Sequence, residues 1–204
     1  MASLAGLARI LNLTFGPTGP KRTGLPRCLA MTDPDRTPDL TRLVDALPEG
    51  AGIIFRHYGA SGRAHIARDL VRHAHQRAQV VLIADDLALA RWAGADGVHM
   101  PSFRLPRLTE ASLRCRPGWL VTAAAHSRLD LMHAARTGVD AALLSPVFPT
   151  RSHPGATALG VPRFAALVRQ AGCPVYAMGG VGGNGLRRLK HSGAAGVAGI
   201  DLFT

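Results

Sequence analysis

Polar side chains that could carry chemistry follow the apolar runs of this sequence. His126 comes just after the run Trp119–Ala123 and directly before a helical stretch. An imidazole at that place could move protons near neutral pH. A helix-capping or hydrogen-bonded structural role is the alternative for His126. His99 lies inside the run Gly97–Met100, and we expect it to be structural.

Three glycines near the end of the sequence are suited to hold a phosphate. Gly179 and Gly180 directly follow an apolar run, and the absence of side chains there lets an anion approach backbone N–H groups. Gly199 comes at the end of the last apolar run. Together they predict a phosphate cradle of the kind that parallel barrels form at their last two strands. A structural turn would also explain the glycine pair.

The loop over residues 145–153 adds polar groups that suit an oxyanion. It contains the hydroxyls of Thr150 and Ser152, the guanidinium of Arg151 and the imidazole of His153. We expect this loop to help hold the phosphate. The alternative is a proline-rich rim loop with incidental polar residues.

Two adjacent carboxylates follow the third apolar run. Asp85 and Asp86 could bind a divalent cation, because Mg²⁺ takes oxygen ligands together with substrate phosphates. They could instead cap the next helix. The sequence favours the cap, since no second carboxylate lies in the neighbouring loop.

Eight short apolar runs must place these residues. Each is apolar nearly throughout, which is typical of strands covered on both faces, as in a parallel sheet. The expected strands are Arg27–Met31, Gly52–Arg56, Gln79–Ala84, Gly97–Met100, Trp119–Ala123, Ala141–Ser145, Pro174–Met178 and Gly196–Ile200.

Amphipathic stretches lie between these strands. Arg63–Gln76, Ser127–Arg136 and Pro162–Gln170 are predicted helices, and in the second of them Leu129, Met132 and Ala135 recur at helical spacing. Alternation of eight strands with helices predicts parallel βαβ units and a (β/α)8 TIM barrel, an α/β fold. A doubly wound sheet is the alternative, but no GxGxxG follows the first strand.

The 204 residues suit one domain with a large core. We expect residues 1–26 to form a short N-terminal helix and a Pro/Gly-rich linker, with the helix covering part of the barrel bottom. Residues 27–204 are the expected barrel domain, and its last helix would be truncated.

Composition argues against several other classes of protein. The formal charge of +11 comes mostly from dispersed arginines, with no basic run and few aromatics, so we expect no nucleic-acid partner. No apolar run could span a membrane and no secretory signal is recognisable, which predicts a cytoplasmic protein. The three widely spaced cysteines, Cys28, Cys115 and Cys173, are expected to be buried thiols.

Read together, these motifs resemble the thiamine-phosphate synthase/TenI family from Arg27 to Phe203. Their order and spacing carry the likeness. The matching pieces are Met31-Thr32-Asp33-Pro34, Ile54-Phe55-Arg56, Ile83-Ala84-Asp85-Asp86, Ala95-Asp96-Gly97-Val98-His99, Ala125-His126-Ser127, Ser145-Pro146-Val147-Phe148-Pro149-Thr150 and Met178-Gly179-Gly180-Val181. The resemblance implies the barrel fold and one of two activities. Synthases join a pyrimidine pyrophosphate to a thiazole phosphate with magnesium, whereas thiazole tautomerases act on the thiazole phosphate alone.

The match is uneven between the two substrate halves. The thiazole-phosphate half is kept: the resemblance implies ligand-binding roles for Thr150, Ser152, Gly179, Gly180 and Gly199 and an acid/base role for His126. We expect Arg56 and His153 to contact the ligand as well. The pyrophosphate half departs from the synthase pattern at Tyr58 and His153, where lysines are expected, at Ala84 for asparagine, at Ala124 for serine and at Arg104 for the second magnesium aspartate. Arg104 would weaken Mg²⁺ binding at Asp85, because it changes the local charge by two units.

We therefore interpret the chain as a TenI-like protein that binds a small phosphorylated thiazole and tautomerises it with His126, without a required metal. The alternative is a working synthase in which Arg104, Arg151 and His153 replace the missing groups, because arginine is a good phosphate clamp. A second alternative is a non-catalytic phosphate-binding or regulatory protein. The sequence leaves a homo-oligomer open.

Overall fold

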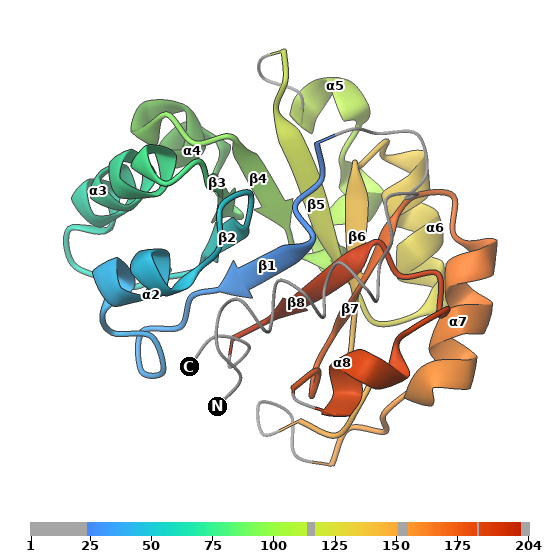
Figure 1. Cartoon of the computed structure of the whole chain (residues 1–204). Coiled ribbons are helices and arrows are strands. Elements are labelled where there is room, and N and C mark those ends of the chain that lie inside the picture. Colours follow the sequence, from blue (N-terminus) through green and yellow to red (C-terminus); the bar gives the residue numbers. More distant parts are fainter. Residues whose placement is uncertain (1–23, 114–116, 151–154, 183, 201–204) are drawn as a thin grey trace.

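Eight parallel strands close into a barrel in their order along the chain (Figure 1). The computed structural model describes residues 24–113, 117–150, 155–182 and 184–200. The α/β TIM barrel predicted from the alternating pattern is confirmed. The strands are β1 (Cys28–Met31), β2 (Gly52–Phe55), β3 (Val80–Ala84), β4 (Gly97–Met100), β5 (Leu120–Ala125), β6 (Ala141–Leu144), β7 (Val175–Met178) and β8 (Gly196–Gly199).

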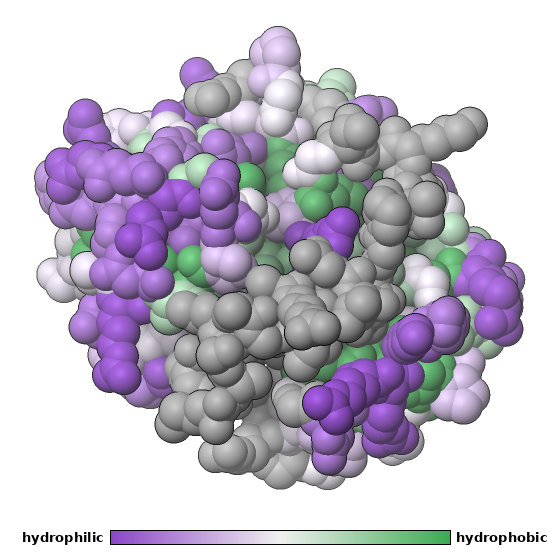
Figure 2. Space-filling model, viewed as in Figure 1, coloured by the Kyte–Doolittle hydropathy of each residue, from purple (hydrophilic) through white to green (hydrophobic). Residues whose placement is uncertain are grey.

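Helices lie between successive strands and surround the barrel (Figure 1). They are α2 (Leu40–Ala46), α3 (Arg63–Gln76), α4 (Leu87–Ala93), the 3-10 helix η1 (Ser102–Arg107), α5 (Glu110–Leu113), α6 (Arg128–Arg136), α7 (Gly160–Gln170) and α8 (Asn184–Arg188). Their outer faces are polar: in Figure 2, hydrophilic side chains spread over the left of this view, on the side of α2 and α3, and over its lower right, on the side of α7 and α8. No helix among the described residues is long and apolar enough to cross a bilayer.

Short polar side chains fix where three of the helices begin. Asp39, Asp86 and Ser127 each accept a hydrogen bond from a backbone N–H in the first turn, of α2, α4 and α6 respectively. Such caps satisfy donors that the helix itself leaves unpaired. The cap role predicted for the Asp85-Asp86 pair thus belongs to Asp86.

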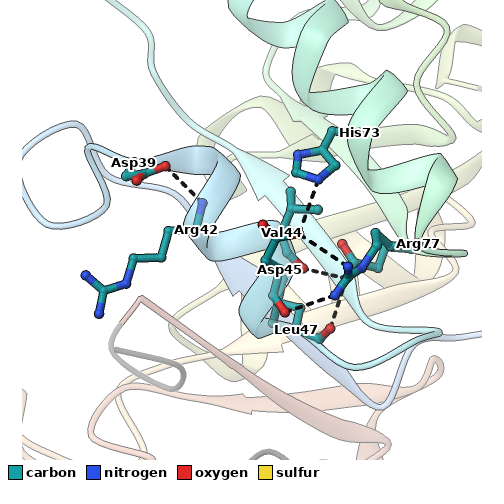
Figure 3. Close-up of polar contacts among 8 residues, drawn as sticks. Asp39, Arg42, Val44, Asp45, Leu47, His73 and Arg77 are labelled. Atoms are coloured by element: carbon teal, nitrogen blue, oxygen red, sulfur yellow. Dashed lines mark hydrogen bonds and ion pairs between the residues drawn. The ribbon is translucent and has the colours of Figure 1, made fainter.

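Polar contacts join α2 to the end of α3 (Figure 3). The Asp45 carboxylate lies 3.3 Å from His73 Nε2 and 3.4 Å from Arg77 Nη1. The Gln79 amide is buried and donates to the Val44 and Leu47 carbonyl oxygens at the end of α2. The Gln79 amide thus binds carbonyl groups at the helix end, where the helix itself leaves acceptors unpaired, and Val44 also accepts the Leu47 N–H.

Alternation along the strands divides the core in two. Side chains such as Ile53 and Phe55 of β2 point outward and pack under the helices, whereas Ile54 points into the barrel. The interior is packed with Leu29, Leu82, Leu143 and other apolar side chains, so the barrel is a core and not a pore.

The structure corrects three details. Most strand bounds move by one or two residues, and β5 runs to Ala125 where we expected Ala123. Gly199 is the last residue of β8 itself. On α6 the expected core face is wrong: Leu129 and Met132 are 58% and 52% exposed, and Leu131 and Ala134 are buried instead. Successive residues of a helix are about 100° apart around its axis. The stripe that contacts the barrel therefore lies beside the one that we expected.

Some predictions fall on residues outside the described ranges. The N-terminal helix and most of its linker lie within residues 1–23, and the truncated last helix would begin within 201–204. Ser152, His153, Arg151 and Cys115 also lie outside the described residues. Of the two described cysteines, Cys28 is buried as expected and Cys173 is only partly buried.

Candidate active site

The carboxyl ends of the strands bring the predicted site residues to one mouth of the barrel. His126 directly follows β5 and Ser145 directly follows β6. The register pairs Ala125 with Leu144, both of which point outward, so the next residue on each strand faces the barrel axis. The same register is continued by the Ser145 N–H, which donates to the Ala125 carbonyl oxygen at 3.0 Å.

His126 is held from two sides although its side chain reaches the surface. Its backbone N–H donates to Asp130 Oδ2 at 2.8 Å, within the first turn of α6. Its ring atom Nδ1 lies 3.2 Å from both the carbonyl oxygen and the hydroxyl oxygen of Ser145, a residue only 6% exposed. From sequence, Ser145 is the last residue of an expected strand and the first of the loop over residues 145–153, with no role of its own. The strand register is the signal that singles it out.

The glycine pair packs tightly against the loop after β6. The Val147 and Phe148 N–H groups donate to the Met178 and Gly179 carbonyl oxygens at 2.9 and 3.0 Å. Gly179 and Gly180 have φ of +86° and +63°, and a Cβ at Gly180 would meet the Phe148 Cβ and the Pro149 carbonyl oxygen. The turn explanation for these glycines therefore holds. Both glycine N–H groups are nevertheless available to a ligand, because no described residue accepts a hydrogen bond from either of them.

Thr150, Gly179, Gly180 and Gly199 lie close together, as the phosphate-cradle hypothesis requires. Thr150 is bonded to Pro149, whose carbonyl oxygen faces Gly180. Met178 of β7 pairs with Ala198 of β8, and Gly179 and Gly199 are the next residues along these two strands, so they lie side by side. A Cβ at Gly179 would come within 2.9 Å of the Pro146 Cα. Since Pro146 follows Ser145, the glycine pair and His126 are linked through contacts at the ends of β5, β6 and β7.

The opposite rim, over β2 to β4, is neutralised by arginines. Arg104 Nε lies 2.6 Å from Asp85 Oδ1, and Arg63 Nη1 lies 2.7 Å from Asp86 Oδ2. Each guanidinium also stacks near an exposed aromatic ring, Arg104 at 5.8 Å from Phe103 and Arg63 at 5.7 Å from Tyr58. At two places on this rim, therefore, an arginine lies between an aromatic ring and a carboxylate.

These residues do not fit the magnesium ion that the family resemblance implies. Mg²⁺ needs several oxygen ligands in octahedral geometry. The Asp85 carboxylate is engaged by Arg104, and Asp86 caps α4 and binds Arg63. Within the described ranges no group of three or more His, Cys, Asp or Glu residues could hold a metal ion. The metal role predicted for Asp85 gains no support from this geometry.

Arg56 supplies a half-buried positive charge inside the mouth. Its backbone N–H donates to Thr32 Oγ1 at 2.9 Å, while its guanidinium makes no hydrogen bond or ion pair with the described part of the chain. Burial, with the Arg56 charge as the second cause, lowers the pKa of His99 to about 3. His99 is therefore neutral, and its Nδ1 lies 2.9 Å from Thr122 Oγ1, in agreement with the structural role expected for it.

A surface groove of about 820 Å³ lies beside α2 and α3, lined by residues that include Asp39, His57 and Asp69. None of the predicted site residues lines it. His57 is buried there with no hydrogen-bond partner for Nε2 among the described residues, and burial lowers its pKa. The mouth of the barrel remains the better candidate, because an imidazole, a pair of glycines and a guanidinium all follow strands at that end.

The sequence model of the thiamine monophosphate synthase family matches residues 28–203. The chain belongs to this family. A protein of Aquifex aeolicus (strain VF5), named only provisionally as thiamine-phosphate synthase 2, is 30% identical over 184 residues, covering 88% of this chain and 98% of its own. The thiamine-phosphate synthase of Chlorobium luteolum is 32% identical over 183 residues, covering 88% and 85% of the two chains.

Solved structures support the fold of this family member. The thiamine phosphate pyrophosphorylase from Pyrococcus furiosus superposes with a TM-score of 0.71 over 86% of this chain and 85% of its own. At 24% identity, this likeness supports the barrel alone. The family resemblance inferred from the sequence is therefore confirmed, while the assignment of a reaction depends on the residues at the mouth.

Proposed function

We propose that this thiamine-phosphate synthase/TenI family member binds a thiazole phosphate and tautomerises its ring, with His126 as the acid and base. One observation carries the proposal. His126 is held beside the glycine cradle, whereas Arg104 pairs with the carboxylate that would bind magnesium. The mouth thus has groups suited to proton transfer and to anion binding. Its Asp85 carboxylate is not free to bind the metal that would assist the departure of pyrophosphate.

In the proposed mechanism the phosphate lies against the N–H groups of Gly179 and Gly180, with help from Thr150. Ser152, His153 and Gly199 are further proposed contacts. Binding at this end would hold the thiazole ring near His126. His126 takes a proton from one ring position and returns it to another, so the ring becomes aromatic with no net change in protons. The Arg56 guanidinium would balance a carboxylate on the ligand, because a half-buried charge favours an ionic partner.

A working synthase is the second candidate, and the names of the relatives favour it. In that case Arg104, with Arg151 and His153, would neutralise the leaving pyrophosphate in place of a metal and lysines. A phosphate-binding protein without turnover would share the cradle and lack both activities.

Two assays on the same preparation separate these functions. The full chain is incubated with hydroxymethylpyrimidine pyrophosphate, thiazole phosphate and Mg²⁺, and thiamine phosphate is measured; robust formation would contradict the proposal. In parallel, proton exchange between thiazole phosphate carboxylate and deuterated water is followed by NMR, and exchange faster than the protein-free control is expected. Binding without either activity would favour the non-catalytic alternative.

A further inference from the structure

Ser145 is the residue that the proposed chemistry does not yet use. It is 6% exposed, it ends the segment that pairs with β5, and both of its oxygen atoms lie 3.2 Å from His126 Nδ1. On the Ser145 side, neither contact depends on a flexible surface side chain. One oxygen belongs to the backbone, and the other is on a one-carbon side chain that the barrel register aims at the same point.

The chemistry of these two oxygens decides which nitrogen of His126 carries the proton. A carbonyl oxygen can only accept a hydrogen bond, whereas a hydroxyl can donate or accept. If Nδ1 were unprotonated, its lone pair would face the Ser145 carbonyl oxygen. With a proton on Nδ1, both oxygens accept from it, and the neutral ring keeps its lone pair on Nε2.

The backbone of His126 is fixed independently of its ring. Asp130 Oδ2 accepts the His126 N–H at 2.8 Å and the Ser127 hydroxyl at 3.0 Å, so one carboxylate holds the chain at the start of α6. Nε2 makes no hydrogen bond with the described residues. A ring held at Nδ1 on a fixed backbone therefore presents Nε2 as its reactive atom.

We propose that Ser145 is a positioning residue that holds His126 as the Nδ1–H tautomer, so that Nε2 is the atom that exchanges a proton with the ligand. The part about the ligand rests on the proposed function. The part about the tautomer does not, because it follows from contacts within the protein. A neutral polar group placed behind a catalytic imidazole sets its orientation without touching substrate.

The tautomer is tested by NMR of full-length protein with ¹⁵N-labelled histidine rings, with His126→Asn used to assign the signals. In the wild-type protein the His126 signals should show a protonated Nδ1 and an unprotonated Nε2 at a pH where the ring is neutral. Ser145→Ala removes the hydroxyl acceptor and keeps the carbonyl oxygen, so it should lower the Nδ1–H population in part, and Ser145→Thr, which keeps the hydroxyl, should restore it. Ser61→Ala is the matched control, because it removes a hydroxyl at an exposed position in the loop between β2 and α3.

A wild-type ring protonated on Nε2, or a tautomer population unchanged in Ser145→Ala, would overturn the inference. Activity provides a second arm: proton exchange should fall about tenfold in kcat in Ser145→Ala with KM changed less than twofold, since ligand contacts are untouched. If the wild-type protein shows no exchange at all, the proposed function fails, and the ring signals still decide the role of Ser145.

Discussion

Arg104 Nε lies 2.6 Å from Asp85 Oδ1 at the rim over β3 and β4. Arg104 stands where the family pattern has a second carboxylate, so a pair of like charges that would attract a cation has become an ion pair. The rest of the rim follows the same pattern, because Asp86 is bound by Arg63. A site built this way has no excess negative charge to attract Mg²⁺.

Replacing Arg104 by aspartate should create an affinity for magnesium that the wild-type protein lacks. Asp85 would lose its guanidinium partner and gain a second carboxylate nearby. Millimolar Mg²⁺ should then raise the melting temperature of Arg104→Asp and leave that of the wild-type protein unchanged, because a ligand that binds only the folded state stabilises it.

The matched control is Arg107→Asp, which makes the same charge change on the same 3-10 helix at an exposed position. Stabilisation of the wild-type protein by Mg²⁺, or loss of its thiazole-phosphate binding on treatment with a chelator, would contradict the metal-free interpretation.

Alanine at Gly180 should weaken phosphate binding and destabilise the fold together. Its φ of +63° is unfavourable for alanine, and the new methyl would meet the Phe148 Cβ and the Pro149 carbonyl oxygen. The expected loss of stability is about 1–3 kcal/mol. Calorimetric titration with thiazole phosphate and thermal melting measure the two effects.

Gly182→Ala is the control for this variant, because a Cβ at that exposed position meets nothing within 4 Å. Equal binding by Gly180→Ala and the wild-type protein would show that the ligand phosphate lies elsewhere.

The fold could be predicted from sequence because it depends on a repeated pattern. Eight apolar runs, each covered on both faces, leave few arrangements other than a closed parallel barrel. The packing face of α6 could not be read in the same way. Leu129 and Met132 form a helical stripe as regular as that of Leu131 and Ala134, and only contact with the barrel decides which is buried.

The sequence predicts which residues belong to the candidate site, but not which of them contact one another. His126 and the glycine pair were found from their places after apolar runs. The contact between His126 and Ser145 was missed because the end of β5 was placed at Ala123, two residues early, and a parallel register cannot be counted from an uncertain end. Arg104 was recognised as a charge opposed to metal binding, but its pairing with Asp85 depends on the path of the 3-10 helix after β4.

Asparagine at His126 should abolish proton exchange at the thiazole ring and leave ligand affinity nearly unchanged. The amide is similar in size and cannot act as a base near neutral pH. The expected fall in exchange rate is about 10²- to 10⁴-fold, measured by NMR in deuterated water, with affinity measured by calorimetry. His133→Asn, in the last turn of α6, is the control. Exchange that persists in His126→Asn would remove this residue from the mechanism.

His99 should make the folded state less stable as the pH falls below neutrality. Its pKa is about 3 in the folded protein, against an ordinary value of 6.5, because of burial and the Arg56 charge. Between these values the unfolded chain binds a proton that the folded chain excludes. Stability from this group is therefore complete above about pH 6.5 and falls by about 1.4 kcal/mol per pH unit toward pH 3.

Urea unfolding at several pH values measures this slope, and His99→Gln should flatten it. The difference between the two proteins isolates His99, because His57, whose pKa burial also lowers, is present in both. Parallel curves for the two proteins would place the acid sensitivity in other groups.

Phenylalanine at Tyr176 should lower stability without affecting the mouth of the barrel. The Tyr176 hydroxyl donates to the Pro26 carbonyl oxygen, and the side chain fills the interior at the amino end of the strands. Removing the hydroxyl leaves that buried carbonyl without its donor, at a cost of about 1–3 kcal/mol. Because His126, Arg56 and the glycine cradle all lie at the opposite end, thiazole-phosphate affinity measured well below the melting temperature should stay within twofold of wild type. A marked loss of affinity would mean that the two ends of the barrel are coupled through its packed interior.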